Sequence, residues 1–189
     1  DALGADTFAQ GLLNLTQTFS GDVGCPRVSP SGLSLFCVHR QPWDRPELWV
    51  SGQVGTRRAY RGLLYTLEDH CWTSETEVAF MHGPEAGWAN VMSVDLDTGL
   101  TRVLIDEPFL GESTVRQLDY CQAVDKLCMV WQPPSWSYGC AVYTANGDGS
   151  EGELVYDDSE GTLIEHFPRW SDDGRFIFWQ QMSASAYGR

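Results

Sequence analysis

The fold of this chain is decided by residues 25–36, which read CPRVSPSGLSLF. A close copy, FPRWSDDGRFIF, occupies residues 167–178 and shares the Pro, the Arg, the Ser, the Gly and the final Phe. In both copies a Ser-x-x-Gly turn leads into an apolar and aromatic run, and glycine at the end of the turn accepts a positive φ. This segment therefore predicts a tight turn between two antiparallel strands.

Two weaker copies of the segment lie between these two. They read HCWTSETEVAF at residues 70–80 and YCQAVDKLCMV at residues 120–130. When the copies are aligned, each turn has one anchor residue: Ser29, Ser74, Val124 and Ser171. The spacings of 45, 50 and 47 residues match the period of a four-stranded propeller blade, about 40–50 residues.

The rest of each unit reads as two further short strands joined by a polar turn. A third strand is expected at 47–50, 90–94 and 140–143, and a fourth at 100–104 and 153–156. The sequence thus predicts an all-β fold, a β-propeller of four blades with four antiparallel strands each. We expect one domain over residues 1–189, with blades at approximately 12–52, 56–95, 100–144 and 151–189.

The repeat resembles that of the TolB-like propellers, the PD40 or WD40-like β-propeller family. Residues 15–50 carry the best copy and residues 167–178 the second best. The resemblance covers nearly the whole chain at the level of the repeat. It implies the fold and leaves function open, because propellers serve many functions.

The N-terminal segment at residues 12–16 matches a fourth strand. It would complete the last blade, which has a short strand near residues 184–187, or a blade of a neighbouring subunit. Three arrangements stay open: a closed four-bladed ring, part of a longer ring, and a head-to-tail assembly in which subunits exchange this strand.

Charge excludes some classes of partner. The formal net charge of the 189 residues is −14, and Lys126 is the one lysine. A surface this acidic repels phosphate backbones and anionic membranes, which argues against nucleic-acid binding. No apolar run approaches the roughly 20 residues of a membrane span, so no membrane insertion is expected.

Six cysteines predict disulfides and an oxidising compartment. The symmetric spacing of Cys25 with Cys37, and of Cys121 with Cys128, suggests two cross-strand pairs and leaves Cys71 and Cys140. Buried free thiols are the alternative. A sequence that begins at Asp1 fits a mature chain whose signal has been removed, and Asn14 lies in a glycosylation sequon.

No catalytic motif is recognisable, and we expect no enzyme activity, no cofactor and no metal site. The loops between second and third strands share one face of a propeller, and they carry the candidate binding residues Trp43, Trp88, Trp136, Tyr138 and Tyr187. Aromatic side chains of this kind anchor protein interfaces and stack on sugars. The alternative is that they cap the core.

These features predict a secreted or periplasmic, non-enzymatic module for structure or interaction outside the cell. Its expected partner is a protein, including a second copy of itself assembled head-to-tail into a filament, with carbohydrate as a further ligand class. Two alternatives follow from the resemblance: the propeller fragment of a larger prolyl-oligopeptidase-like hydrolase, and a TolB-like periplasmic protein-binding scaffold.

Overall fold

A computed structural model of the protein describes residues 22–29, 35–40, 47–52, 55–62, 70–83, 90–106, 114–132, 141–157 and 163–183. Within these ranges every regular element is a β-strand. The strands form three four-stranded sheets and one two-stranded sheet, all antiparallel, which we call blades 1 to 4.

The strands follow one another along the chain. Blade 1 contains β1 (Asp22–Val28), β2 (Leu35–Arg40), β3 (Glu47–Gly52) and β4 (Gly55–Arg61). Blade 2 contains β5 (His70–Trp72), β6 (Glu77–His82), β7 (Asn90–Asp95) and β8 (Thr101–Ile105). Blade 3 contains β9 (Thr114–Cys121), β10 (Lys126–Gln132), β11 (Ala141–Asn146) and β12 (Glu153–Asp157). Blade 4 contains β13 (Leu163–Trp170) and β14 (Ile177–Ser183).

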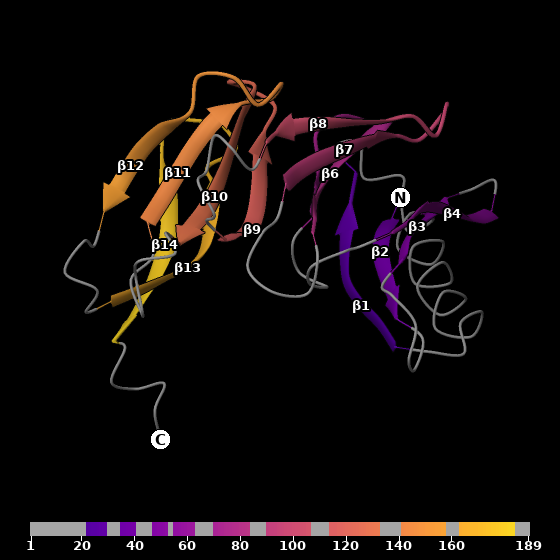
Figure 1. Ribbon diagram of the computed structural model, residues 1–189, viewed down its shortest axis with the longest axis horizontal. Helices are drawn as coiled ribbons and strands as arrows, with labels where there is room; N and C mark the ends of the chain where they lie inside the picture. The colour runs from indigo at the N-terminus through magenta and orange to yellow at the C-terminus, as the bar shows by residue number, and fades with distance from the viewer. Residues whose placement is uncertain are drawn as a thin grey trace, which may run out of the picture.

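Each four-stranded blade pairs its strands in chain order. The predicted blade boundaries are shifted, because the predicted spans 56–95 and 100–144 begin with β4 and β8, which pair with β3 and β7 of the preceding blades. In Figure 1 blade 1 lies at the right, blade 2 in the middle and blade 3 at the left, and the strands of blade 4 overlap those of blade 3 in this view. The first strands of successive blades are neighbours: β1 contacts β5, β5 contacts β9, and β9 contacts β13. We call these four the inner strands.

The core lies between the blades, because both faces of a middle strand are apolar. In β6, Val78 and Phe80 pack in a cluster with Leu48 of blade 1. The alternate residues Ala79 and Met81 pack in a second cluster, which blade 3 completes. Burial on both faces explains why β6 reads as a continuous apolar run rather than as an alternating one.

The turns of blades 2 and 3 differ from the sequence prediction. The Thr73 N–H donates to the Glu77 carbonyl at 3.0 Å, so the turn is anchored at Thr73 and not at Ser74. In blade 3 the strands stay paired through Cys121, which is therefore the anchor in place of Val124. The blade 2 turn is one residue shorter than the others, and the blade 3 turn contains neither serine nor glycine. The sequence alignment of the repeat therefore places the anchors of these two turns incorrectly.

The predicted disulfide between Cys121 and Cys128 is wrong, because both are free, buried thiols. Their strands join through the turn at residues 122–125, whose centre lies one residue earlier than expected. The register therefore places Cys121 opposite Lys126 and Cys128 opposite Asp119. The two thiols lie on one face of the blade but not opposite each other.

The prediction for Cys71 is wrong as well, since it too is a free, buried thiol. Cys140, the other cysteine that the two expected pairs leave over, lies outside the described residues. The side chains of Cys25 and Cys37 also lie outside the described part, so that pairing stays a prediction. The N-terminal strand at 12–16 and the last strand near 184–187 are likewise outside it.

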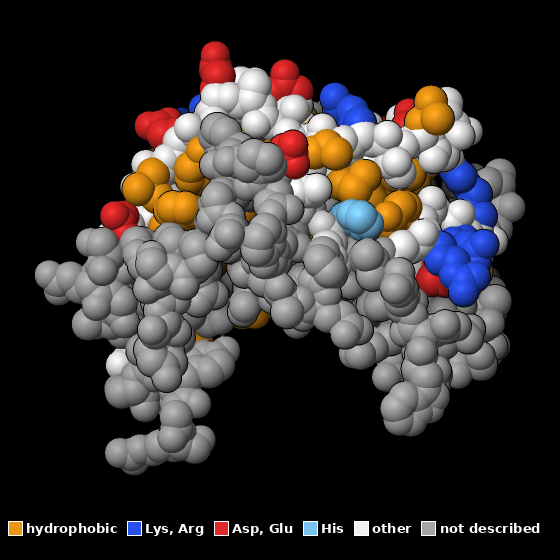
Figure 2. Space-filling model, in the orientation of Figure 1, with side chains coloured by type: hydrophobic (Ala, Val, Ile, Leu, Met, Phe, Trp, Pro, Cys, Tyr) orange, Lys and Arg blue, Asp and Glu red, His pale blue; other side chains and the backbone are white. Residues whose placement is uncertain are grey.

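Charged side chains are unevenly placed on the face that Figure 2 shows. Asp and Glu side chains stand along the upper left margin, Lys and Arg side chains gather at the right, and hydrophobic side chains lie between them. Within the described ranges, no helix is long and apolar enough to cross a membrane.

Candidate functional site

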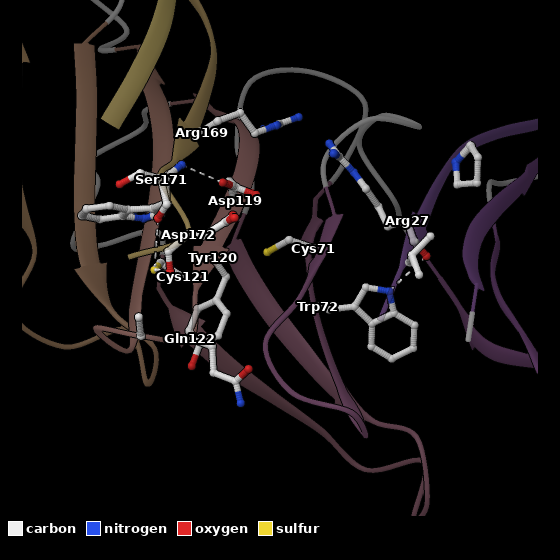
Figure 3. Close-up of a pocket in the computed structure, with 14 residues that line it drawn as sticks. Arg27, Cys71, Trp72, Asp119, Tyr120, Cys121, Gln122, Arg169, Ser171 and Asp172 are labelled. Carbon is white, nitrogen blue, oxygen red and sulfur yellow. Dashed lines mark hydrogen bonds between the residues drawn. The ribbon is translucent and has the colours of Figure 1, made fainter. Parts of the chain in front are cut away.

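A pocket of about 710 Å³ lies where the four inner strands meet. Its walls come from the ends of β1, β5, β9 and β13 and from the first residues of the turns that follow β9 and β13. Figure 3 shows these walls. The pocket is a product of the repeat, because each blade contributes the same part of its first strand.

One position of the repeat dominates the pocket walls. Counting back two residues from each turn anchor gives Arg27 in blade 1, Cys71 in blade 2, Asp119 in blade 3 and Arg169 in blade 4. All four residues line the pocket. The repeat thus gathers two guanidinium groups, a carboxyl and a thiol that are far apart in the sequence.

Hydrogen bonds between neighbouring inner strands fix the walls. The Trp72 indole donates to the Arg27 carbonyl at 3.1 Å. The backbone N–H of Trp170 donates to the Asp119 carboxylate at 2.9 Å. The thiol of Cys121 donates to the Ser171 carbonyl at 3.6 Å. Side chains of one blade therefore hold the backbone of a neighbouring blade, which keeps the wall residues in place.

A β-bulge in β9 and another in β13 precede Asp119 and Arg169. Gln117 and Phe167 are the bulged residues, with φ of 58° and 54°. The Gln117 side-chain oxygen accepts the Phe167 N–H at 2.6 Å, which links the two bulges. Because bulges re-aim the residues that follow them, they contribute to turning Asp119 and Arg169 toward the pocket.

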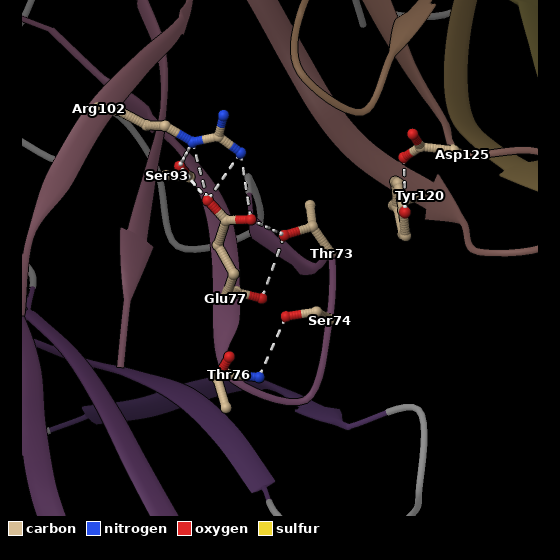
Figure 4. Close-up of polar contacts among 8 residues, drawn as sticks. All are labelled: Thr73, Ser74, Thr76, Glu77, Ser93, Arg102, Tyr120 and Asp125. Carbon is tan, nitrogen blue, oxygen red and sulfur yellow. Dashed lines mark hydrogen bonds and ion pairs between the residues drawn. The ribbon is translucent and has the colours of Figure 1, made fainter. Parts of the chain in front are cut away.

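The turns beside the pocket are tied to the blades by polar side chains (Figure 4). Thr73 donates its hydroxyl to the carboxylate of Glu77 at 3.3 Å, and Glu77 pairs with Arg102 at 3.0 Å. In blade 3 the Tyr120 hydroxyl donates to the Asp125 carboxylate at 2.8 Å. These contacts hold the two turns against the strands that frame the pocket.

Burial has the largest effect on the pKa values of Asp119 and Cys71 in the pocket. Burial raises the pKa of Asp119 above its usual value, against the lowering effect of the Trp170 N–H and of the charges of Arg169 and Arg27. Burial, with a smaller contribution from Asp119, also raises the pKa of the Cys71 thiol well above its usual value. A thiol with a raised pKa stays protonated at neutral pH and is a weak nucleophile.

The two arginines extend over the pocket from opposite sides in Figure 3, with Cys71 between them and Asp119 below Arg169. The positive charges of Arg169 and Arg27 both lower the pKa of Asp119, so the two guanidinium groups act on the same carboxyl. Arg169 also donates to the Pro168 carbonyl at 2.8 Å, which uses one of its five N–H donors. The arrangement can therefore hold a small polar group between two guanidinium groups.

The structure does not describe the binding residues predicted from the sequence. Trp43, Trp88, Trp136, Tyr138 and Tyr187, and the sequon at Asn14, all lie outside the described residues. Their roles stay predictions. No group of three or more His, Cys, Asp or Glu side chains that could hold a metal ion occurs in the part of the chain that the structure describes.

Sequence reasoning missed the residues of the pocket wall. The signal was present: the Pro-Arg pair precedes the turn in both of the best copies, at Arg27 and Arg169. The pair aligns the two copies of the repeat, but the sequence alone does not show where the two arginines meet. Asp119 carries no such signal, because its copy of the repeat is the weakest.

Comparison with known proteins supports the fold. No family model and no curated protein matches the chain. A solved structure of TolB from Agrobacterium tumefaciens is similar with a TM-score of 0.66 and 15% identity, over 87% of this chain and 57% of that one. A chain of the nidogen–laminin complex gives 0.65 and 12%, over 90% and 64%. A prolyl endopeptidase gives 0.60 and 17%, over 86% and 26%.

These similarities show a β-propeller fold. The chain spans less than two thirds of the length of each of these three proteins. Identities of 12% to 17% carry the fold and not the function. Membership of the PD40 repeat family, the number of blades in the ring and the single-domain assignment stay predictions.

Proposed function

We propose that this chain is a non-enzymatic β-propeller that binds a segment of a protein partner in the pocket between its inner strands. The observation that carries the proposal is the convergence of four equivalent strand ends on one pocket of about 710 Å³. This volume lies within the range of about 300–1,000 Å³ that is usual for ligand sites.

The chemistry of the walls suits a peptide segment. Trp72, Tyr120 and Trp170 line the pocket beside the charged groups. Rigid aromatic side chains together with arginine are the residues that anchor protein interfaces most often. The nidogen–laminin complex is an assembly of proteins, and one of its chains has this fold, which supports a protein as the class of partner.

The non-enzymatic part of the proposal rests on the groups that could act as nucleophiles. Burial raises the pKa of Cys71, and burial together with Asp125 raises the pKa of Tyr120. The Ser171 hydroxyl donates to the Asp173 carboxylate at 2.8 Å and is turned toward its own turn. None of the described residues that line the pocket is a histidine, so the pocket lining offers no imidazole base for these groups.

The test is selection of peptides from a random phage-displayed library on the immobilised chain. Ala123 lines the pocket and is exposed, so Ala123→Trp would fill the pocket from its rim. Leu100→Trp, at a 71% exposed position away from the pocket, is the matched control. Peptides that lose binding to Ala123→Trp and keep it for Leu100→Trp support the proposal. Peptides that bind both variants equally contradict it.

A second proposal, self-association, is favoured by the ends of the row of blades. Phe178 takes the place in blade 4 that Cys128 takes in blade 3, because both precede the residue opposite the bulge. Cys128 is 0% exposed and Phe178 is 61% exposed. At the other end, Val28 is 43% exposed. We propose that the exposed face of blade 4 packs on blade 1 of a second copy, as successive blades pack within the chain.

Sedimentation velocity over a range of concentrations tests this association. Head-to-tail packing predicts that Phe178→Ser and Val28→Ser each weaken association. A symmetric contact between two β14 faces predicts that Val28→Ser has no effect. A wild-type monomer at every concentration contradicts the proposal. The predicted strand exchange involves residues 12–16, outside the described part, and stays a prediction.

The hydrolase alternative keeps some support from the similarity to a prolyl endopeptidase. In that alternative the catalytic groups belong to a further domain, so a hydrolase domain encoded in the same gene would favour it over our proposal. Secretion or a periplasmic location also stays a prediction. The free thiols of Cys71, Cys121 and Cys128 remove the support that expected disulfides at these residues had given it.

A further inference from the structure

Arg27 and Arg169 are the most unusual feature of the pocket. They belong to a chain with 12 Lys and Arg against 26 Asp and Glu, yet the repeat brings the two together at one site. Among the described residues, no carboxylate forms an ion pair with either guanidinium group. Ion pairs with described carboxylates therefore do not explain why the two arginines lie at this site.

The charges of the wall limit what it can bind. Asp119 is a partly buried carboxyl of the pocket, and its carboxylate accepts a hydrogen bond from the Trp170 N–H. Two guanidinium groups against this one carboxyl leave one excess positive charge when Asp119 is ionised, and two when it is protonated. Asp172 also lines the pocket, but it is exposed in the turn, where water screens it.

One excess charge favours a ligand with an isolated negative group. A polyphosphate or nucleic acid would meet the field of a chain of net charge −14 and the carboxyl of Asp119. A cation would meet two guanidinium groups. A carboxylate matches the planar fork of arginine and accepts paired N–H bonds from it. The aromatic walls then contact the apolar atoms beside that carboxylate.

We propose that the pocket selects a peptide carboxylate, which is bound between Arg27 and Arg169. This inference rests on the proposed peptide-binding function and names the chemistry of its ligand. The carboxylate comes either from an Asp or Glu side chain or from a peptide C-terminus, and both present the same group to the two arginines.

Isothermal titration with three synthetic peptides separates these sources. Acetyl-Gly-Asp-Glu-Asp-Gly-amide has acidic side chains and no free terminus. Acetyl-Gly-Asn-Gln-Asn-Gly with a free carboxylate has only the terminal group, and its amide form has neither. We expect one of the first two to bind at least about tenfold more tightly than the neutral amide, because a hydrogen bond to a charged group typically gives a factor of this size.

Variants assign the preference to the two arginines. Arg27→Gln and Arg169→Gln should each reduce the acidic-over-neutral ratio to near one, while Arg27→Lys keeps part of it. Asp119→Asn should increase the ratio, because it removes a negative charge from the wall. Arg57→Gln, an exposed arginine of β4 outside the pocket, is the control and should leave the ratio unchanged. Melting temperatures show whether each variant is folded.

The outcomes separate the inference from the function on which it rests. Equal binding of acidic and neutral peptides that Ala123→Trp abolishes would leave the peptide-binding function standing and overturn the carboxylate preference. An acidic preference that survives both arginine variants in folded proteins also overturns the inference. No binding of any of the three peptides, together with no pocket-dependent peptide from the phage selection, overturns both.

Discussion

Leu127→Ala tests the packing of blade 2 on blade 3. Leu127 is 0% exposed and lies in the core cluster that joins the two blades, with Met81 and Leu118 among its members. Removing three buried carbons from such a site typically lowers the free energy of unfolding by about 2–5 kcal/mol, because the surroundings collapse only partly into the cavity. At roughly 2–4 °C for each kcal/mol in a chain of this size, the melting temperature should fall by roughly 4–20 °C.

The control is Leu100→Ala, the same change at a leucine that is 71% exposed in the turn before β8. Such a surface change should alter stability by no more than about 0.5 kcal/mol. Thermal and urea unfolding followed by circular dichroism measure both variants. Equal effects of the two changes, or a loss below about 1 kcal/mol for Leu127→Ala, would refute the packing of the blades through this cluster.

Three further predictions concern backbone strain, pH and thiol reactivity. Gly99 and Gly149 both have a positive φ. Gly99→Ala should therefore cost about 1–2 kcal/mol. Gly149→Ala should cost about 1–3 kcal/mol more, since its Cβ would overlap the Leu104 carbonyl; equal losses of melting temperature contradict this. Asp119→Asn should raise the melting temperature at pH 7 but not below pH 3.8. Burial raises the pKa of Asp119 in the folded protein above its ordinary value of 3.8. Ionisation of this carboxyl therefore lowers the stability of the folded protein as the pH rises from 3.8 through the raised pKa. A variant less stable than wild type at pH 7 but equal to it in acid would reverse the predicted sign. The Cys71 thiol should resist iodoacetamide in the native state and react after denaturation, as site-resolved mass spectrometry would detect; rapid native labelling contradicts its burial.

The fold could be predicted from the sequence because the repeat carries local signals. The turns of blades 1 and 4 contain serine and glycine at fixed offsets, and the apolar runs that follow them become the second strands β2 and β14. Blade 3 lacks these turn residues, so its register was misplaced and its cysteines were paired wrongly. A shift of one residue in the centre of a turn changes every pair in a hairpin, and sequence spacing alone does not fix that centre.

The pocket could not be predicted from the sequence in the same way. It depends on which side chains of four different strands meet, and that is decided by packing between blades rather than by any local pattern. The bulges at Gln117 and Phe167 contribute, and neither residue type signals a positive φ. The repeated Pro-Arg pair was visible, but only the arrangement of the inner strands shows that Arg27 and Arg169 share a site with Asp119.

The central claim is that the inner strands build a binding pocket whose two arginines act together. Nuclear magnetic resonance of the side-chain Nε–H groups of arginine measures this directly during titration with the peptide that binds most tightly. The account predicts that the Arg27 and Arg169 signals shift together with a single dissociation constant while the Arg57 signal stays in place. Shifts that spread evenly over all arginines, or that leave Arg27 and Arg169 unmoved while the peptide binds, would contradict it.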